Sequence, residues 1–158
     1  MISIKNKELP GRLKFRFFHK PTQKIIPGYG FNPYFVFGDV TDGIGTEYNP
    51  AKFEDCVIMQ NTGFYDIHQR QVYESDIVRY TCDSDYCADG YHKCKNCNSG
   101  KIYKIYWEEL SGRFKYGSFN ENEENYDIDL EEEDTEYCME IIGNIYENPE
   151  LIGGKDAR

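Results

Sequence analysis

The sequence has little alanine or leucine, and it has no long apolar segment. Only three alanines and five leucines occur among 158 residues, so the apolar residues that most favour helices are scarce. No apolar run approaches the roughly 18 residues that a transmembrane helix needs. The first residues, MISIKNKELPGRLK, lack the apolar stretch and the small-residue cleavage site of a secretory signal. We therefore expect a soluble protein of the cytoplasm that makes no membrane contact.

Basic residues are scarce in the C-terminal half. Residues 1–81 carry ten basic and nine acidic side chains, whereas residues 82–158 carry eight basic and 19 acidic ones. The net charge of −10 repels nucleic-acid phosphates unless the field is strongly segregated. Two features favour nucleic acid. Residues 5–24 hold seven basic and one acidic side chain, interleaved with Phe, and four cysteines lie between residues 82 and 97 in a compact knuckle of a kind that binds nucleic acids in other families. Direct nucleic-acid binding is therefore an alternative that the overall charge disfavours.

The motifs of common enzyme classes are also missing. The sequence has no serine elbow, phosphate-binding loop or HExxH pattern. The polar residues that remain, His19, Asp66, His68 and Glu74, occur singly in predicted turns and loops. An isolated histidine in a polar loop is usually solvated, and acid–base or nucleophilic catalysis needs a positioned set of groups. We assign no catalytic residue and expect no enzyme.

Aromatic residues are abundant, with 14 Tyr, 10 Phe and one Trp. Such residues suit the half-buried surface of a sheet, so the composition predicts a mostly β protein. In RLKFRFF (residues 12–18) the residues Leu13, Phe15 and Phe17 alternate with basic ones, which is the period of a strand. Further strands are predicted at residues 34–40, 56–60, 72–81 and 138–147, and a hairpin at residues 101–107 and 113–119.

The remaining segments are predicted to be irregular. The Gly and Pro residues of IIPGYGFNPYF (residues 25–35) favour an irregular segment. Residues 121–136 hold ten acidic side chains in 16 positions, and we interpret residues 120–136 as a solvated acidic loop. NPELI (residues 148–152) predicts a one-turn helix, with Asn148 as the N-cap and Pro149 in the first position. The whole chain, residues 1–158, is predicted to be one domain with an insert.

The insert is a cysteine-rich stretch, residues 82–100, which contains CDSDYCADGYHKCKNC. In a reducing compartment, clustered cysteines are more often metal ligands than disulfides. The two-residue spacer of Cys94 and Cys97 suits a metal knuckle, and the four-residue spacer of Cys82 and Cys87 lies at the wide end of the usual range. We expect these four thiolates to bind one structural Zn²⁺. The link between the pairs is short, so His92 is a substitute ligand, and disulfides or free thiols are the alternatives. Cys56 and Cys138 lie in apolar strands and are expected to be buried packing residues.

Three stretches together resemble the YopX family of phage and prophage proteins. They are GRLKFRFFHKPTQKII near the N-terminus, IMQNTGFYDIHQRQVYESDIVRY in the middle and EIIGNIYENPELI near the C-terminus. The cysteine-rich stretch lies outside these blocks. The chain departs from the family pattern at Phe18 and His19, and at turn positions where Gln69, Arg70 and Ser75 replace glycine-containing turns. Because such positions often need positive φ, these changes predict altered turns.

The resemblance implies a small barrel-like antiparallel β core, encoded among phage accessory genes, that forms cyclic homo-oligomers. It supplies no catalytic residue. We expect a non-enzymatic phage or prophage accessory protein that works as a binding and assembly module through homo-oligomerisation. A further alternative is an inhibitor of a host or defence protein, in which the acidic tract, with Glu131, Glu132, Glu133 and Asp134 at the partner surface, mimics nucleic-acid phosphates.

Overall fold

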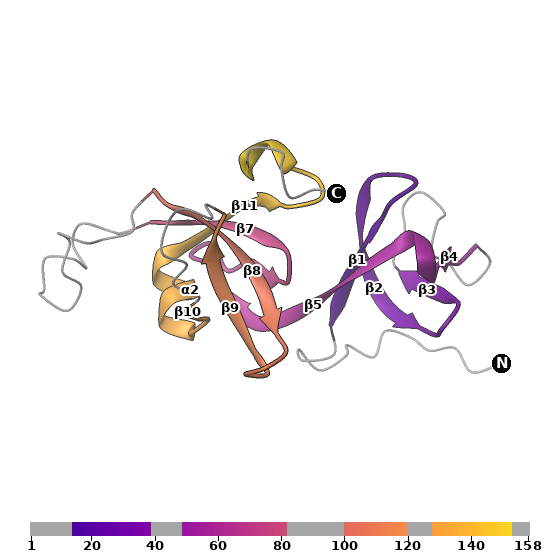
Figure 1. Cartoon of the computed structure of the whole chain (residues 1–158), viewed down its shortest axis with the longest axis horizontal. Coiled ribbons are helices and arrows are strands. Elements are labelled where there is room, and N and C mark those ends of the chain that lie inside the picture. The colour runs from indigo at the N-terminus through magenta and orange to yellow at the C-terminus, as the bar shows by residue number, and fades with distance from the viewer. Residues whose placement is uncertain (1–13, 39–48, 82–99, 120–127, 153–158) are drawn as a thin grey trace, which may run out of the picture. The chain divides into compact units, whose positions relative to one another are not determined.

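The computed structural model describes residues 14–38, 49–81, 100–119 and 128–152, and Figure 1 shows its strands and helices. The chain divides into two compact units, Met1–Asn61 and Thr62–Arg158, called unit 1 and unit 2 below. Each unit has its own cluster of buried hydrophobic side chains. The sequence pattern predicts one domain and places no boundary here, because the division falls inside a continuous strand, β5 (Cys56–Tyr65).

Unit 1 is a set of antiparallel strands built around β1. This strand pairs with β2 on one side and with the first half of β5 on the other. A 3-10 turn at Phe53–Asp55 leads from β4 into β5, and the order of the six-stranded sheet is β4, β3, β2, β1, β5, β6. The strands of unit 1 before β5 are β1 (Phe15–His19), β2 (Lys24–Phe31), β3 (Phe35–Gly38) and β4 (Ala51–Lys52).

The alternation of apolar and basic residues in β1 corresponds to alternating burial, as the period of two predicts. Phe15 and Phe17 are buried, and Arg16 between them is more exposed. The two phenylalanines pack with Ile26, Val36, Ala51 and Cys56 in the core of unit 1. The pattern stops at the end of β1, where Phe18 and His19 are both buried.

The prediction of an irregular segment at residues 25–35 is wrong, because most of it forms β2. Two glycines explain why Gly and Pro are compatible with this strand. A Cβ atom at Gly28 would overlap the ring of Phe15, and a Cβ atom at Gly38 would lie 2.6 Å from the carbonyl oxygen of Pro27. The register between β2 and β3 shifts between Gly28 and Gly30. The glycines thus permit close approach of strands and a bulge, rather than ending the strand.

Unit 2 contains the second sheet, whose strand order is β10, β9, β8, β7, β11. The predicted hairpin is confirmed as β8 and β9, which are joined by a turn in which Gly112 has φ 65°. The predicted last strand is confirmed as β11, and NPELI forms the predicted helical turn at Pro149–Ile152. The elements of unit 2 after β5 are β6 (Gln71–Tyr73), β7 (Asp76–Tyr80), β8 (Ile102–Glu108), β9 (Arg113–Ser118), β10 (Ile128–Asp129), α2 (Glu132–Cys138), β11 (Met139–Asn144) and the final 3-10 turn.

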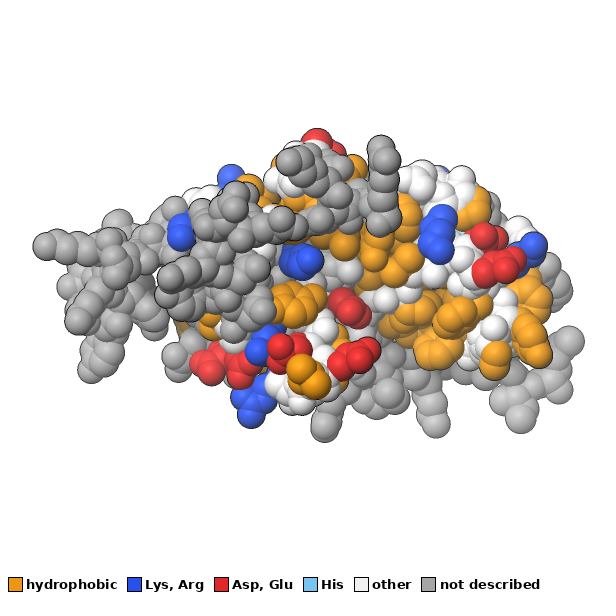
Figure 2. Space-filling model, in the orientation of Figure 1, with side chains coloured by type: hydrophobic (Ala, Val, Ile, Leu, Met, Phe, Trp, Pro, Cys, Tyr) orange, Lys and Arg blue, Asp and Glu red, His pale blue; other side chains and the backbone are white. Residues whose placement is uncertain are grey.

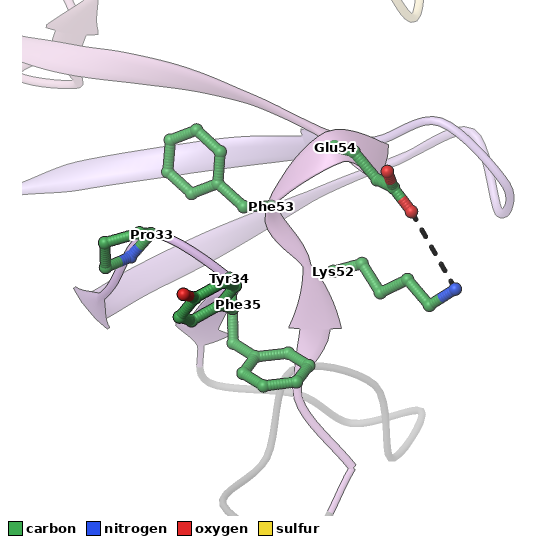
Figure 3. A pocket seen from close by; sticks show the side chains of 6 residues that line it. All are labelled: Pro33, Tyr34, Phe35, Lys52, Phe53 and Glu54. Carbon is green, nitrogen blue, oxygen red and sulfur yellow. Dashed lines mark ion pairs between the residues drawn. The ribbon is translucent and has the colours of Figure 1, made fainter.

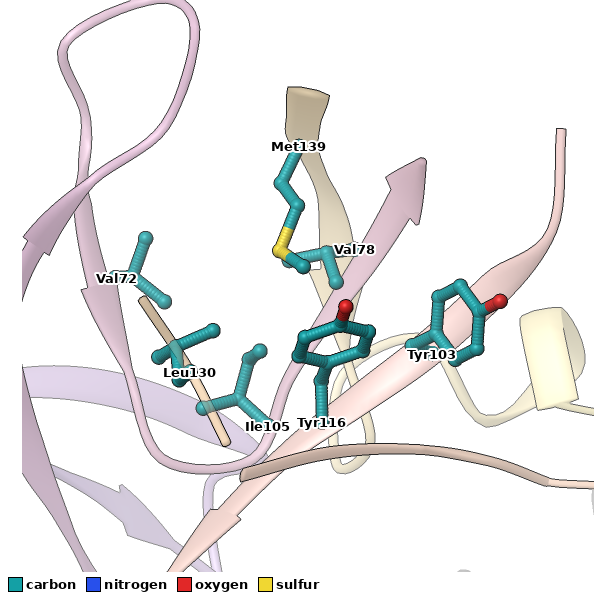
Figure 4. Close-up of a cluster of buried hydrophobic side chains, with 7 residues drawn as sticks. All are labelled: Val72, Val78, Tyr103, Ile105, Tyr116, Leu130 and Met139. Carbon is teal, nitrogen blue, oxygen red and sulfur yellow. The ribbon is translucent and has the colours of Figure 1, made fainter. Parts of the chain in front are cut away.

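The core of unit 2 is formed by side chains from both sheets and from the segment after β10. Tyr103 and Tyr116 make an edge-to-face contact with ring centroids 5.2 Å apart. Figure 4 shows these two rings beside the aliphatic members of the cluster. The buried residues of the cluster are Val72, Val78, Tyr103, Ile105, Tyr116, Leu130 and Met139.

The prediction of a barrel-like core is wrong in one respect. Within the described ranges, neither sheet closes on itself, since β4 and β6 end one sheet and β10 and β11 end the other. The coarser prediction, a mostly β protein of antiparallel strands, is confirmed. In the part of the chain that the structure describes, no helix is long and apolar enough to cross a membrane.

The acidic segment is not a solvated loop throughout. Residues 120–127 lie outside the described residues, but β10 pairs with β9 and α2 follows directly. Leu130 and Thr135 are buried. Asp129 pairs with Arg113 at 2.7 Å and with Lys115 at 3.8 Å. The acidic segment contains two apolar residues, Ile128 and Leu130, and their burial holds this part of the segment in the fold.

Candidate functional sites

The predicted zinc ligands, Cys82, Cys87, Cys94 and Cys97, and the substitute ligand His92 all lie outside the described residues. The structure does place the ends of the insert. The N–H of Gly100 donates to the carbonyl of Tyr80 at 2.8 Å, and the N–H of Tyr80 donates to the carbonyl of Lys101 at 2.9 Å. The insert therefore leaves and re-enters at adjacent points of the β7–β8 pair. Among the described residues, no group of three or more His, Cys, Asp or Glu side chains could hold a metal ion.

Cys56 and Cys138 are buried free cysteines, as predicted. Burial, together with the neighbouring charge of Asp55, raises the pKa of the Cys56 thiol to about 11. A thiol with so high a pKa is protonated at neutral pH and is a poor nucleophile or metal ligand. Both residues act as small hydrophobic groups in their cores.

The proposed partner-binding residues lie at the start of α2. Glu131 is exposed and immediately precedes the helix, and Glu132, Glu133 and Asp134 are its first residues. Acidic residues are favourable in the first turn because the exposed amides there carry partial positive charge. Their position is therefore explained by helix formation as well as by partner binding.

Asp66 is fully buried and has its carboxylate surrounded by donors. Its Oδ1 accepts from the N–H groups of His68 at 3.0 Å and Arg70 at 2.9 Å. Its Oδ2 accepts from Arg70 Nε at 2.8 Å and from the N–H of Ile141 at 3.1 Å. Burial raises the pKa of this carboxyl, but the hydrogen bonds from Arg70, Ile141 and His68 outweigh burial and hold the pKa below its usual range. Asp66 is thus an ionised structural group.

Two other polar residues considered for catalysis, His68 and His19, make contacts within their own units. His68 is about half exposed and lies 3.5 Å from Glu140, which also pairs with Arg79 at 2.8 Å. The bond from Arg79 is the main cause that lowers the pKa of Glu140. His19 belongs to unit 1, where its ring shares a 2.8 Å hydrogen bond with the hydroxyl of Thr22. These groups form local surface and turn contacts.

A second buried carboxylate, Asp76, organises the turn between β6 and β7. Its Oδ2 accepts from the N–H of Tyr73 at 2.9 Å, and its Oδ1 accepts from the side-chain amide of Asn144 at 3.4 Å. Thr62 plays a similar part in β5, since its hydroxyl donates to the carbonyl of Val72 at 2.9 Å and accepts from the N–H of Phe64. Thr62, Asp66 and Asp76, which belong to the middle block of the family resemblance, therefore have structural roles in unit 2.

The departures at Gln69 and Ser75 do not alter the backbone in the way that the loss of glycine suggests. Gln69 has φ 60° and Ser75 has φ 69°. Both residues lie in the left-handed region that glycine favours. The turns keep that conformation, and the non-glycine residues bear its steric cost.

An exposed aromatic surface in unit 1 is the feature that the sequence pattern did not locate. Phe31 and Phe53 contact one another with ring centroids 6.1 Å apart. The most exposed member, Tyr34, is 75% exposed. In Figure 2 hydrophobic side chains gather over the strands of unit 1 on the visible face. We use the term aromatic surface for the exposed large aromatic side chains of unit 1, which are Tyr29, Phe31, Tyr34, Phe35 and Phe53.

The aromatic surface includes a shallow groove of about 380 Å³. Figure 3 shows the rings of Tyr34, Phe35 and Phe53 directed away from one another around it. Pro33 forms part of the wall, and Lys52 and Glu54 form an exposed ion pair at 3.8 Å on the rim. In a strand every second side chain lies on the face of the sheet away from the core. Only the tertiary structure decides whether another element covers that face.

Comparison with known proteins identifies relatives by sequence and by fold. A family model described as YopX protein matches residues 14–153. The crystal structure of protein EF1440 from Enterococcus faecalis is similar to this chain with a TM-score of 0.55 and 21% sequence identity, over 88% of this chain and 96% of that one. At that identity the likeness concerns the fold alone. No curated protein gives a significant match.

Proposed function

The chain belongs to the YopX family, and from this premise we propose that it is a non-enzymatic accessory protein of phage or prophage origin. It acts in the host cytoplasm as a binding and assembly module, through contacts between copies of itself. The observation that carries the proposal is the aromatic surface of unit 1. Five large aromatic side chains of this unit are exposed, and three of them, Tyr34, Phe35 and Phe53, line one groove. Large apolar patches on a protein surface mark contact sites, and aromatic residues are enriched where protein partners meet.

The charge of the two units supports a second copy as the occupant of this surface. Unit 1 has eight basic and six acidic side chains, whereas unit 2 has ten basic and 22 acidic ones. Unlike units of two copies would therefore attract, and like units would repel. Such complementarity fixes orientation more than it adds affinity. It favours a head-to-tail contact, which closes into a ring when the rotation between copies permits.

The alternatives differ in which of these surfaces they use. Nucleic-acid binding would combine the aromatic surface with the basic residues of the same unit, among them Lys14, Lys20 and Lys24, because bases stack on aromatic rings. Inhibition of a host protein would instead use the acidic residues at the start of α2. Both alternatives predict a complex with a different molecule in place of self-association.

The experiment is the measurement of molar mass by light scattering over a range of protein concentrations at low and high salt. We expect a mass above that of the monomer at tens of micromolar in low salt, and a lower mass in high salt because salt screens the charges. Tyr34→Ser and Phe53→Ser are expected to lower the mass. Leu110→Ser is the matched control, since Leu110 is 98% exposed in unit 2 and lies outside the aromatic surface.

Two outcomes would contradict the assembly proposal. One is a monomeric mass at tens of micromolar in low salt. The other is an equal loss of mass in the Tyr34 and Leu110 variants. A pull-down from host lysate, with and without nuclease, then separates the alternatives, because only a nucleic-acid complex is removed by nuclease.

For the insert, we propose one structural Zn²⁺ held by Cys82, Cys87, Cys94 and Cys97. The support is the spacing of the cysteines and the position of the insert across the β7–β8 pair, where a metal would tie down a polar segment without disturbing the sheet. We expect about one zinc per chain in reduced protein. The Cys94→Ser/Cys97→Ser variant is expected to lose the metal, and His92→Ala tests the substitute ligand. Equal metal content in the wild-type protein and the double variant would exclude the site.

A further inference from the structure

The outer edge of β11 has its backbone hydrogen bonds occupied by side chains and by the backbone of two turns rather than by another strand. β11 is the last strand of the five-stranded sheet and pairs with β7 on its inner edge. An edge strand normally presents free N–H and C=O groups, which are a template for pairing with another chain. The edge of β11 differs, because a turn from the preceding part of unit 2 lies against it.

Asp66 and Arg70, on either side of the turn between β5 and β6, provide these bonds. The N–H of Ile141 donates to Asp66 Oδ2 at 3.1 Å, and the carbonyl of Ile141 accepts from Arg70 Nη2 at 2.7 Å. Two residues earlier on the same edge, the carbonyl of Met139 accepts from the N–H of Ile67 at 3.0 Å. A carboxylate acceptor and a guanidinium donor thus take the positions that the C=O and N–H groups of a neighbouring strand would take.

The far end of the same edge is closed in a similar way. The N–H of Asn144 donates to the side-chain oxygen of Asn148 at 3.1 Å, and the carbonyl of Asn144 accepts from the N–H of Asn148 at 2.8 Å. The bonds at Met139, Ile141 and Asn144 together cover both ends and the middle of β11. They are local contacts within unit 2.

The Asp66–Arg70 pair is itself held in place. Asp66 is fully buried, while the side chain of Arg70 is about half exposed. The two side chains form an ion pair at 2.6 Å, and the turn between them is closed by the N–H of Asp66, which donates to the carbonyl of Arg70 at 2.9 Å. Planar guanidinium geometry lets Arg70 contact the carboxylate and the Ile141 carbonyl at the same time. An ammonium group on a flexible stem lacks this geometry.

We propose that Asp66 and Arg70 form a side-chain cap on the outer edge of β11, and that this cap keeps β11 from pairing with β11 of a second copy. Two such edges would pair in antiparallel fashion about a two-fold axis, since that arrangement places the same backbone groups of each strand opposite one another. The edge of β11 is therefore an interaction surface for an extended strand, closed in its middle by the side chains of Asp66 and Arg70 and at its ends by Ile67 and Asn148. This inference is independent of the assembly proposed for the aromatic surface of unit 1.

The experiment compares Asp66→Asn with the wild-type protein. Asparagine keeps the oxygen that accepts the two turn bonds from His68 and Arg70, but its amide nitrogen presents a donor to the N–H of Ile141. We expect hydrogen exchange of the Ile141 amide to rise about tenfold, a change of the size expected for one hydrogen bond. The amides of Val78 and Ile105, in the interior of the same sheet, are expected to keep their protection.

The molar mass is the second measurement. Asp66→Asn is expected to reach up to twice the mass of the wild-type assembly as the concentration is raised, whatever the wild-type mass is. The molar mass of the wild-type protein thus tests the assembly proposal. The ratio of the variant's molar mass to that of the wild-type protein tests the cap. Arg70→Gln removes the guanidinium bonds to Asp66 Oδ2 and to the carbonyl of Ile141. It leaves the three backbone N–H bonds to Asp66 in place. It is the second cap variant, and its molar mass is expected to rise in the same way as that of Asp66→Asn.

Arg79→Gln is the matched control. It removes an arginine that pairs with Glu140 across the β7–β11 pair, on the surface rather than at the outer edge. It is expected to leave both the Ile141 exchange and the molar mass unchanged. The proposal is overturned by unchanged Ile141 exchange in Asp66→Asn, by unchanged mass in both cap variants, or by an equal increase of mass in the control.

Discussion

Unit 1 and unit 2 are both built from antiparallel strands, but among the described residues unit 1 exposes more large aromatic side chains and unit 2 buries more polar ones. Unit 1 buries Phe15, Phe17 and small aliphatic residues and leaves five large aromatic side chains exposed. Unit 2 buries a larger apolar cluster and, within it or beside it, the polar residues Asp66, Asp76, Thr135 and Asn144. Buried polar groups need partners, and those partners specify one arrangement of turns and edges. The comparison indicates that polar contacts specify the turns and edges of unit 2, whereas the exposed aromatic side chains of unit 1 are the surface for which we propose a partner.

The strongest test of this division is the removal of the largest fully buried side chain of unit 1. Phe17→Ala is expected to destabilise the protein by about 3–5 kcal/mol, because it deletes an aromatic ring and leaves a cavity. Hydrogen exchange with mass-spectrometric detection is expected to show loss of protection in β1, β2 and β3. Protection of β8 and β9 in unit 2 is expected to persist, since their core has no member in unit 1. Equal loss in both units would show that the two cores unfold as one cooperative structure.

A second test concerns the acidic segment of unit 2. Leu130→Ala is expected to cost about 2–3 kcal/mol in the free energy of unfolding, because Leu130 is a buried member of the core. Glu131→Gln, at the exposed neighbouring position, is expected to change it by less than about 0.5 kcal/mol. Urea denaturation measures both. If the two variants behave alike, the segment is not held by its apolar residues.

A third test uses the pH dependence of stability to probe the buried carboxylate of Asp66 in unit 2. The folded-state pKa of Asp66 is lowered, so its contribution to stability is fully present above the unfolded-state pKa, near 4, and is lost as the pH falls through the lower folded value. We expect the stability of the wild-type protein to fall below about pH 4, and this slope to be reduced in Asp66→Asn. Glu140→Gln is the control, since the pKa of Glu140 is also lowered but its carboxylate is on the surface. An unchanged slope in Asp66→Asn would contradict the role of this carboxylate in unit 2.

The smallest expected effect concerns the left-handed turn residues, which occur in both units. Gln69→Gly is expected to stabilise the protein by up to about 1 kcal/mol, because glycine adopts positive φ without steric cost. Gln23→Gly makes the same change in unit 1, but it also removes the hydrogen bond from the Gln23 side chain to the carbonyl of Lys20. We therefore expect a larger gain at Gln69. Thermal unfolding measures both, and destabilisation by Gln69→Gly would show that its side chain contributes more than the strain.

Periodic patterns predicted the strands well where one face is buried. β1 and the β8–β9 hairpin lie where the alternation and the glycine-containing loop place them. The sequence pattern did not predict β2 or the segment from Ile128 to Leu130, for the same reason in both cases. Glycine, proline or acidic residues dominate the local composition, whereas only one or two residues determine that the segment packs in the fold. Gly28 is required by the ring of Phe15, which is remote in the sequence.

The candidate sites also differ in whether a local sequence pattern predicts them. The spacing of Cys94 and Cys97 is a local pattern, so the zinc site is a prediction from sequence, and its residues lie outside those that the structure describes. The aromatic surface depends on what covers β2, β3 and β4, and the β11 cap joins Asp66 to Ile141, 75 positions apart. No local pattern contains such contacts.

By itself the sequence determined the class of the fold, the family and the position of the cysteine-rich insert. Composition and strand periodicity are local properties, and the three shared blocks are read directly from the chain. Only the tertiary structure decided that the chain has two cores, which aromatic side chains of unit 1 are exposed, and that Asp66 and Arg70 close the edge of β11. Burial and edge pairing depend on which distant segments meet, and that is settled by packing and by the need of each buried polar group for a partner.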